Sequence, residues 1–377
     1  MTNPQSVPNQ QIPTGVATGI AYCSLPKTPE RVLAPSVSPD RARLIQVLSS
    51  KWVNGTHLHY YFFDKQTDGE NVRLANGSTQ WRPWTTSDSE KNVVRKAFAG
   101  WKELGIGLEF SEVDSRDEAE IRIGFMQDDG AWSYVGRDIL GIGRDSRTMN
   151  FGWSLTGADG AETALHEIGH TLGFPHEHQN PNAGIVWDEE AVYAALAAPP
   201  NSWPRETTFH NIIRKIAPDQ VRGSNWDPNS VMHYPFGPGM IKEPAQYRSG
   251  LAPAGGLSAF DREYALSFYP RLAETDYEAL EPMKSTPLSL RPGAQKNFVI
   301  EPSATRNYTF ATFGWSDTVL ALFEEVDGQL RHRAADDDSG EERNAMFRAK
   351  LYKGRRYVLR VRLYWADQTG ETAVMMW

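Results

Sequence analysis

The twelve residues 166–177 constrain this chain more than any other stretch, because they read His-Glu-Ile-Gly-His-Thr-Leu-Gly-Phe-Pro-His-Glu. His166 and His170 are four residues apart, so on a helix both imidazoles lie on one face and can reach one ion. Gly173 can adopt a left-handed backbone that ends the helix. The chain can then turn back and bring His176 to the same ion. Three histidines with an open fourth position are typical of a catalytic zinc site rather than a closed structural one.

Glu167 stands next to the first histidine, where its side chain can reach the metal cavity without being a ligand. Zinc held by three histidines lowers the pKa of a water in the fourth position toward about 7. Glu167 is placed to take the proton as this water attacks a carbonyl, and to return it to the leaving amine. The sequence therefore predicts hydrolysis of amide bonds without a covalent intermediate.

A second motif, Ser-Val-Met-His-Tyr at residues 230–234, lies downstream of the histidine stretch. The extended histidine stretch, followed by a methionine in such a turn, is the signature of the metzincin class of zinc peptidases. Met232 is expected to pack as an apolar floor beneath the three imidazoles. The phenol of Tyr234 could reach the zinc as a fifth ligand, or donate a hydrogen bond to the oxyanion that develops during hydrolysis.

Together the two motifs resemble those of the astacin family of zinc endopeptidases among the metzincins, and the chain is similar to its bacterial type. Glu177 directly after the third histidine, and the Ser-x-Met-His-Tyr turn, separate astacins from other metzincins. The resemblance covers about residues 40–270. It implies one catalytic zinc ion in a zinc-dependent metalloprotease, and a catalytic domain in which an active-site helix precedes the methionine turn.

The resemblance also implies a role for each matching residue. His166, His170 and His176 would be the zinc ligands, Glu167 the general base, and Tyr234 a switchable fifth ligand. Glu177 would support the site through hydrogen bonds to a mature N-terminus or to the methionine turn that carries Met232. Substrate would lie antiparallel to an edge strand. The residues expected to form this edge strand are Ala131, Trp132, Ser133 and Tyr134.

The chain departs from the family in its cysteines and in its leader. Cys23 is the single cysteine, so the disulfides of animal astacins are absent, as is the Phe-x-Gly-Asp stretch whose aspartate blocks the zinc in their propeptides. A lone thiol in a leader could bind the ion as a thiolate, in the manner of the cysteine switch of matrix metalloproteinases. We therefore predict that Cys23 blocks the zinc in a latent zymogen. The alternative is an incidental cysteine packed by Tyr22 and Leu25.

The order of segments predicts an α+β fold: a two-lobed metzincin catalytic domain with a twisted sheet and helices, followed by a small all-β sandwich. We expect a proline-rich leader at residues 1–40, the peptidase domain at 41–270, a linker at 271–287 and the sandwich at 288–377. Periodicity and capping residues predict helices at 87–104, 160–172, 188–198, 205–216 and 258–269. Strands are predicted at 58–63, 108–113 and 121–125.

The C-terminal segment contains short apolar runs between Gly, Asp and Asn turns, the pattern of a β-sandwich. It is similar to the bacterial pre-peptidase C-terminal (PPC) domain, a module appended to secreted proteases. The matching residues are 290–293, 308–310, 316–320, 336–340 and 354–357. The acidic run at residues 336–338 could bind a calcium ion (Ca²⁺), although a solvated acidic turn is the more ordinary interpretation.

Charge and hydropathy exclude several classes of partner. The formal net charge is −8, whereas a nucleic-acid-binding protein usually has a positively charged surface. No run of about 18 apolar residues predicts a transmembrane helix, and residues 1–22 lack the apolar core of a signal peptide. Either a signal was removed, or export uses another route, or the protein stays inside. The family resemblance favours a secreted monomer that cleaves proteins or peptides.

Two other functions fit part of the pattern. One is a metzincin peptidase restricted to a single partner, such as a toxin, which cleavage profiling on denatured proteins would separate from a broad peptidase. The other is a catalytically inactive zinc-binding adhesion module beside the sandwich. The intact Glu167 argues against the inactive module, because zinc binding alone needs no general base.

Overall fold

The computed structural model describes residues 20–27, 51–52, 54–74, 76–216, 225–271, 277–337, 339–365 and 368–377. The chain divides into two compact units. The larger unit comprises Cys23–Pro175, Ser230–Met232 and Gly255–Trp377. The smaller unit comprises the residues up to Tyr22, His176–Asn229 and His233–Ala254. Of the predicted leader, only residues 20–27 fall within the described residues.

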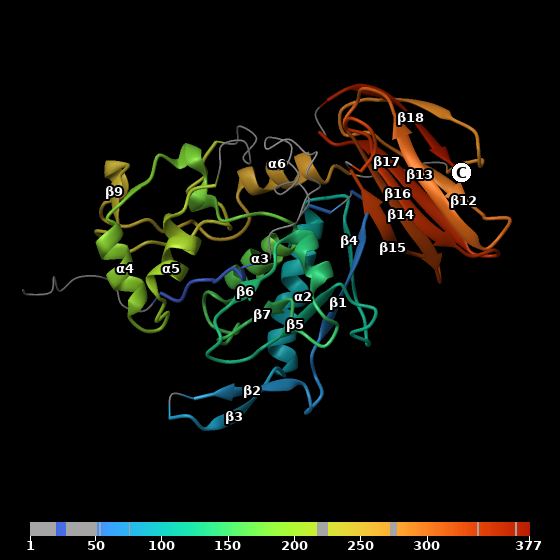
Figure 1. Ribbon diagram of the computed structural model, residues 1–377. Helices are drawn as coiled ribbons and strands as arrows, with labels where there is room; N and C mark the ends of the chain where they lie inside the picture. The colour runs from blue at the N-terminus through green and yellow to red at the C-terminus, as the bar shows by residue number, and fades with distance from the viewer. Residues whose placement is uncertain are drawn as a thin grey trace, which may run out of the picture. The chain divides into compact units, whose positions relative to one another are not determined.

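The first part of the larger unit is built around a five-stranded sheet of order β4-β1-β5-β7-β6 (Figure 1). Its strands are β1 (His57–Phe62), β4 (Glu109–Glu112), β5 (Ile121–Gly124), β6 (Trp132–Ser133) and β7 (Met149–Asn150). The first four in this order run parallel to their neighbours, while β6 pairs antiparallel with β7. The strand predicted to receive substrate therefore lies at an edge of the sheet.

Three helices of the larger unit follow the predicted ranges closely. They are α2 (Asp88–Glu103), α3 (Gly160–Thr171) and α6 (Ala259–Phe268). The apolar stripe of α2 includes Phe98 and Trp101, which share one hydrophobic core with Tyr60 of β1 and Ile168 of α3. Such burial of aromatic and aliphatic side chains contributes most of the stability of a layer of this kind. The core thus fixes α3, the helix that carries the histidine motif, against the sheet.

A β-hairpin formed by β2 (Gly69–Arg73) and β3 (Thr79–Pro83) was not predicted from the sequence. Its strands are largely exposed and polar, so they lack the alternation of apolar residues by which a strand is normally identified. The hairpin lies between β1 and α2 in the chain and contributes none of its described residues to the hydrophobic core that α3 shares with β1 and α2.

The smaller unit contains short elements joined by long irregular segments. They are β8 (Val186–Trp187), α4 (Glu189–Ala197), α5 (Arg205–Thr208) and β9 (Ile241–Glu243). α4 lies within the helix predicted at 188–198, and Asp188 caps it, since its carboxylate accepts from the amide of Ala191 at 3.2 Å. The helix predicted at 205–216 is shorter, because α5 continues only as a π-helical turn, Phe209–Ile213.

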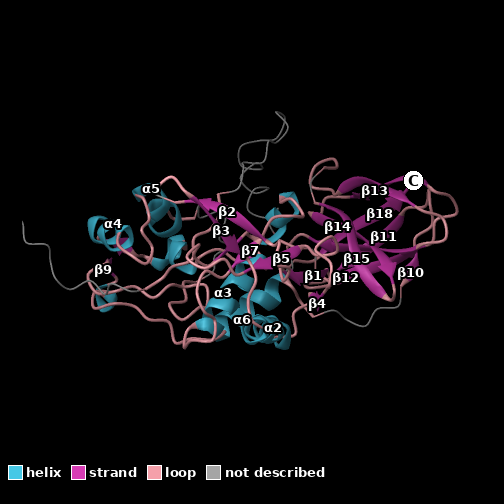
Figure 2. Ribbon diagram, turned by 90° about the horizontal axis from the view of Figure 1, so that it is seen from below, coloured by secondary structure: helices cyan, strands magenta, loops and turns pink. Residues whose placement is uncertain are grey.

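The C-terminal region forms two packed sheets, drawn entirely as strands and loops in Figure 2, whose strand pairs are antiparallel except for β10 with β12. One sheet has the order β10-β12-β17-β14-β15 and the other β11-β18-β13-β16. The strands are β10 (Glu278–Ala279), β11 (Thr286–Leu290), β12 (Gln295–Ile300), β13 (Arg306–Phe313), β14 (Thr318–Val326), β15 (Gln329–Asp336), β16 (Met346–Leu351), β17 (Arg356–Leu363) and β18 (Gly370–Met376). The all-β sandwich is thus present.

Two details of the sandwich differ from the sequence prediction. β10 and the start of β11 fall within residues 271–287, the range predicted as a linker, because so short a strand as β10 leaves no periodic signal. β15 was missed since its sequence, Gln-Leu-Arg-His-Arg-Ala-Ala-Asp, is polar in the middle. Among the described residues, no helix is both long and apolar enough to span a membrane.

Candidate metal centre

The helical part of the histidine motif ends where the sequence predicts. Gly173 has a φ of +89°, in the left-handed region that glycine occupies without strain. The amide of Phe174 donates to the carbonyl of Gly169 at 3.0 Å, which closes the last turn of α3 in the usual way for a left-handed termination. The chain then leaves the helix axis, and three residues after Gly173 it reaches His176, where the second segment of the smaller unit begins.

The two histidines of α3 are held in one tautomer. His166 Nδ1 pairs with the carbonyl of Val231 at 2.7 Å, and His170 Nδ1 pairs with the carbonyl of Phe174 at 2.7 Å. A carbonyl only accepts, so each Nδ1 carries the proton and each Nε2 presents a lone pair. The two Nε2 atoms lie 3.1 Å apart. Two lone pairs at this distance repel unless a cation stands between them, so the pair fits a metal ion.

Burial disfavours protonation of His166, so a proton does not readily take the place of the metal ion. Burial lowers the pKa of His166 to about 4, although the bond to the Val231 carbonyl acts in the opposite direction. Near neutral pH the His166 imidazole is therefore uncharged, which is the state that binds a transition metal.

Cys23 and Glu167 complete the cluster within the larger unit. The ligand atoms of Cys23, His166 and His170 lie within 4.8 Å of one another, and all three side chains are buried. Cys23 Sγ donates to Glu167 Oε2 at 3.5 Å. Burial raises the pKa of the Glu167 carboxyl to about 8, and the contact with Cys23 opposes this rise. One sulfur and two imidazole nitrogens are a donor set that suits zinc.

The methionine of the second motif lies against α3. If Gly169 carried a Cβ, that atom would be 2.3 Å from Met232 Sδ, so only glycine allows this contact. The turn that carries Met232 is held by Asp261, which accepts from Ser230 Oγ at 2.6 Å and from the Val231 amide at 2.9 Å. Asp261 was not predicted as a site residue. Its signal in the sequence was the Ser-x-x-Asp capping pattern at the start of α6.

The remaining predicted residues lie together in the smaller unit. Tyr234 and His176 are buried, and the Tyr234 hydroxyl lies 2.5 Å from His176 Nε2. Glu177 Oε1 accepts from Asn180 Nδ2 and from the amide of Asp227, both at 3.1 Å. Glu177 therefore ties the segment after the third histidine to the segment that leads into the methionine turn.

Two aromatic residues outside the predicted site hold the far end of α3. Trp52 Nε1 donates to the carbonyl of Thr171 at 2.7 Å, and the Tyr269 hydroxyl donates to the carbonyl of Leu172 at 2.6 Å. The amide of Trp52 in turn donates to Tyr269 Oη at 3.2 Å. The last carbonyls of a helix have no partner within it, so these side chains satisfy them. Sequence reasoning missed both, because a tyrosine or tryptophan gives no sign of which carbonyl it will meet.

The predicted substrate strand is in contact with the leader. The amide of Ser24 donates to the carbonyl of Ala131 at 3.1 Å, directly before β6. Within β6, Ser133 is fully buried and its hydroxyl lies 3.1 Å from Thr171 Oγ1 on α3. Tyr134 follows, with its amide bonded to the Thr148 carbonyl at 3.0 Å. The leader thus occupies main-chain positions at the edge where substrate is predicted to bind.

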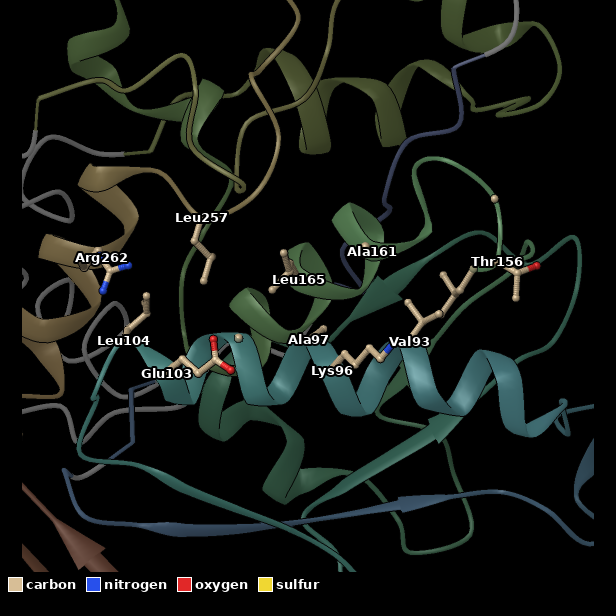
Figure 3. A pocket seen from close by; sticks show the side chains of 13 residues that line it. Val93, Lys96, Ala97, Glu103, Leu104, Thr156, Ala161, Leu165, Leu257 and Arg262 are labelled. Atoms are coloured by element: carbon tan, nitrogen blue, oxygen red, sulfur yellow. The ribbon is translucent and has the colours of Figure 1, made fainter.

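A cavity of about 670 Å³ lies on another side of α3. Figure 3 shows Lys96 and Val93 of α2 along it, Leu165 of α3 above them, and Leu257 and Arg262 from the segment that includes the start of α6. None of the predicted site residues lines this cavity.

Comparison with known families identifies the region that holds this geometry. Residues 83–237 match the model of the peptidase family described as Astacin. This region of the chain is thus similar to an astacin peptidase domain. The matched residues include α3, His176, Met232 and Tyr234, whereas Cys23 and the sandwich lie outside them.

The chain has relatives among curated proteins and solved structures. It is 28% identical over 144 residues to Metalloendoproteinase 1-MMP of Arabidopsis thaliana, a match covering 33% of this chain and 39% of that protein. It is also 28% identical over 198 residues to Protein SpAN of Strongylocentrotus purpuratus, a match covering 49% of this chain and 29% of that protein. The chain thus spans well under half the length of these relatives. A structure of myroilysin is 28% identical with a TM-score of 0.50, covering 60% of this chain and 98% of that one.

These likenesses agree with the architecture. The fold is an α+β astacin-type metzincin domain followed by an all-β sandwich. The family is one of zinc metalloendopeptidases, and the cluster of Cys23, His166 and His170 is a possible zinc-binding group.

Proposed function

We propose that this chain is a zinc-dependent endopeptidase, with His166, His170 and His176 as the ligands of one catalytic zinc ion. The match to the astacin family supports the class of enzyme. The fixed tautomers of the two histidines on α3 support metal binding, and the motif spacing supports His176 as the third ligand. When bound, zinc supplies Lewis acidity to the scissile carbonyl and makes an attacking water more acidic.

The protein's own residues move the protons of the reaction. Glu167 takes a proton from the attacking water as its oxygen bonds to the carbonyl carbon, and delivers that proton to the leaving nitrogen as the C–N bond breaks. The Tyr234 hydroxyl donates to the oxygen of the carbonyl as negative charge develops there. Met232 packs beneath α3 and Glu177 braces the segment after His176, so these two residues position the others. Substrate main chain pairs with the edge formed by residues 131–134.

One observation carries this proposal: two histidine lone pairs 3.1 Å apart form a cluster with Cys23, whose thiol contacts the buried carboxyl of Glu167. The test is Glu167→Ala in the full-length chain, with zinc content and cleavage of denatured casein both measured. We expect proteolysis to fall by about 10³-fold while zinc stays bound, because the general base is lost and the ligands are not. Proteolysis that survives this change would defeat the mechanism. Glu167→Asp serves as the matched variant, with partial activity expected from a shorter carboxylate.

We also propose that the leader keeps the enzyme latent through Cys23. The contact of its thiol with Glu167, and its place beside His166 and His170, support this idea because a thiolate there would take the fourth zinc position. The bond from Ser24 to Ala131 supports it further, since the leader then also covers the substrate edge. The alternative of a cysteine packed only by Tyr22 and Leu25 lacks a reason for these polar contacts.

The remaining sequence expectations complete the proposal. We propose a leader at 1–40, a peptidase domain at 41–270 and a PPC-like sandwich, in a secreted monomer that acts on proteins or peptides. Calcium at residues 336–338 stays a sequence prediction, because Asp338 lies outside the described residues. The described Asp336 carboxylate accepts from the amide and hydroxyl of Ser339, at 2.8 and 2.6 Å, as an acidic turn would.

A further inference from the structure

The residue before Cys23 is buried among aromatic rings of the smaller unit. Tyr22 is 6% exposed. Its ring meets the edge of Tyr234 with centroids 5.2 Å apart, stacks on Phe236 at 5.9 Å and tilts against Trp203 at 6.3 Å. Pairs in these arrangements are favourable beyond the area that they bury. The three rings form a pocket that suits one aromatic side chain.

The walls of this pocket are held by contacts that do not involve Tyr22. Phe236 packs edge-on against Trp187 with centroids 4.7 Å apart and against His178 at 5.3 Å. His178 is itself fixed by a bond from Nε2 to the carbonyl of Asn211 at 2.9 Å. The pocket is therefore part of the smaller unit rather than a wrapping that the leader induces around itself.

The side chain of Asn201, in the smaller unit, forms two hydrogen bonds with the main chain of the leader. Asn201 Oδ1 accepts from the amide of Tyr22 at 2.9 Å, and Asn201 Nδ2 donates to the carbonyl of Ile20 at 2.8 Å. A single carboxamide thus pairs with one donor and one acceptor two residues apart, as a neighbouring strand would. These bonds involve no side chain of the bound segment, so any extended peptide can make them.

From these contacts we infer that Asn201, Trp203, Tyr234 and Phe236 form a substrate subsite for an aromatic residue, which Tyr22 occupies in the latent chain. The inference rests on the proposed function and names its substrate class: extended peptides with Tyr or Phe at the position that this pocket receives. The pocket adjoins the catalytic group of the smaller unit, because Tyr234 both contacts Tyr22 and bonds to His176. Tyr22 also directly precedes Cys23, the residue proposed to block the zinc.

The test measures binding and cleavage separately in the full-length chain with Tyr22→Ala and Cys23→Ala, which vacates the pocket without cutting the protein. The probe is a fluorescent peptide of residues 20–27 with Cys23→Ser, carrying Tyr, Phe or Ala at position 22. We expect the Tyr and Phe peptides to bind at least about tenfold more tightly than the Ala peptide, since an aromatic side chain buries roughly 150–250 Å².

Two variants in the same background locate the effect. Asn201→Ala should weaken all three peptides by about tenfold or more, because it removes bonds to the main chain. Trp203→Ala should weaken only the aromatic peptides and so reduce their advantage to below about threefold. Trp315→Ala is the control, because this tryptophan of the sandwich is 88% exposed and lies outside the pocket.

Cleavage then separates this inference from the proposed function. Among peptide substrates that differ only by Tyr, Phe, Leu or Ala at one position, those with Tyr or Phe should have the higher kcat/KM. Equal binding of the Tyr and Ala peptides, unchanged by Asn201→Ala, overturns the subsite even if the enzyme is active. Selective binding without any zinc-dependent cleavage supports the subsite and overturns the peptidase instead.

Discussion

The two groups of proposed site residues are held in different ways. His166, Glu167 and His170 project from α3, whose apolar side chains share the core of the larger unit with the sheet and α2. His176 and Tyr234 lie on irregular segments of the smaller unit, where aromatic contacts and single hydrogen bonds replace a packed helix. Regions with few packed elements open more easily than a core helix. We therefore expect α3 to govern whether zinc is retained, and the smaller unit to govern whether it is used.

The largest test of this contrast compares His170→Ala with His176→Ala. Each should lower kcat/KM by about 10³-fold or more, because several kcal/mol of transition-state stabilisation are lost with a ligand. Zinc content after dialysis should differ, however. His176→Ala leaves Cys23, His166 and His170 together in one unit and should retain weakly bound zinc, whereas His170→Ala should retain none.

His210→Ala is the matched control, since this histidine of the smaller unit belongs to no cluster of ligands among the described residues. Equal zinc content in His170→Ala and His176→Ala would remove the proposed division of labour between the two units.

The next test addresses the smaller unit alone. Tyr234→Phe removes a hydroxyl but no ring, so we expect kcat to fall by about 10²-fold with little change in KM, as for the loss of one oxyanion donor. Zinc content should stay at the level of the unchanged chain. Tyr193→Phe in α4 is the control and should leave kcat intact. A Tyr234→Phe enzyme with full kcat would assign this tyrosine to packing only.

The leader contacts both groups of residues, through Cys23 at Glu167 and through Tyr22 at Tyr234. The effects of these two neighbouring leader residues can therefore be measured separately. Cys23→Ala in the full-length chain should raise peptidase activity by about tenfold or more, because a larger fraction of molecules then has an open metal site. The gain should be smaller than in the Tyr22→Ala, Cys23→Ala double variant, since Tyr22 still occupies its pocket. Initial rates on a peptide substrate measure both. Unchanged activity after Cys23→Ala alone would sink the proposed latency.

The same contrast marks what the sequence could predict. α3 and its end at Gly173 followed from spacing and from glycine's backbone freedom, because both are local properties of the chain. The contacts of Asp261, Trp52 and Asn201 could not be predicted, since each joins segments far apart in the chain through a carbonyl or amide that any residue has. His176 was predicted from the turn that Gly173 allows, and Tyr234 from its place in the methionine turn, although no local period marks the irregular segments that hold them.

The smallest expected effect concerns the support of α3 by Tyr269. Tyr269→Phe removes the donor to the Leu172 carbonyl and the acceptor for the Trp52 amide, so the free energy of unfolding should fall by about 1–2 kcal/mol. Zinc release to a chelator should become several-fold faster, because the end of α3 nearest His170 loosens. Tyr308→Phe in the sandwich is the matched control: its buried ring also donates to a backbone carbonyl, that of Ala304 at 3.1 Å. It should lower stability by about 1 kcal/mol in urea unfolding and leave zinc release unchanged. Faster release from both variants would mean that general stability, rather than the clamp on α3, controls the metal.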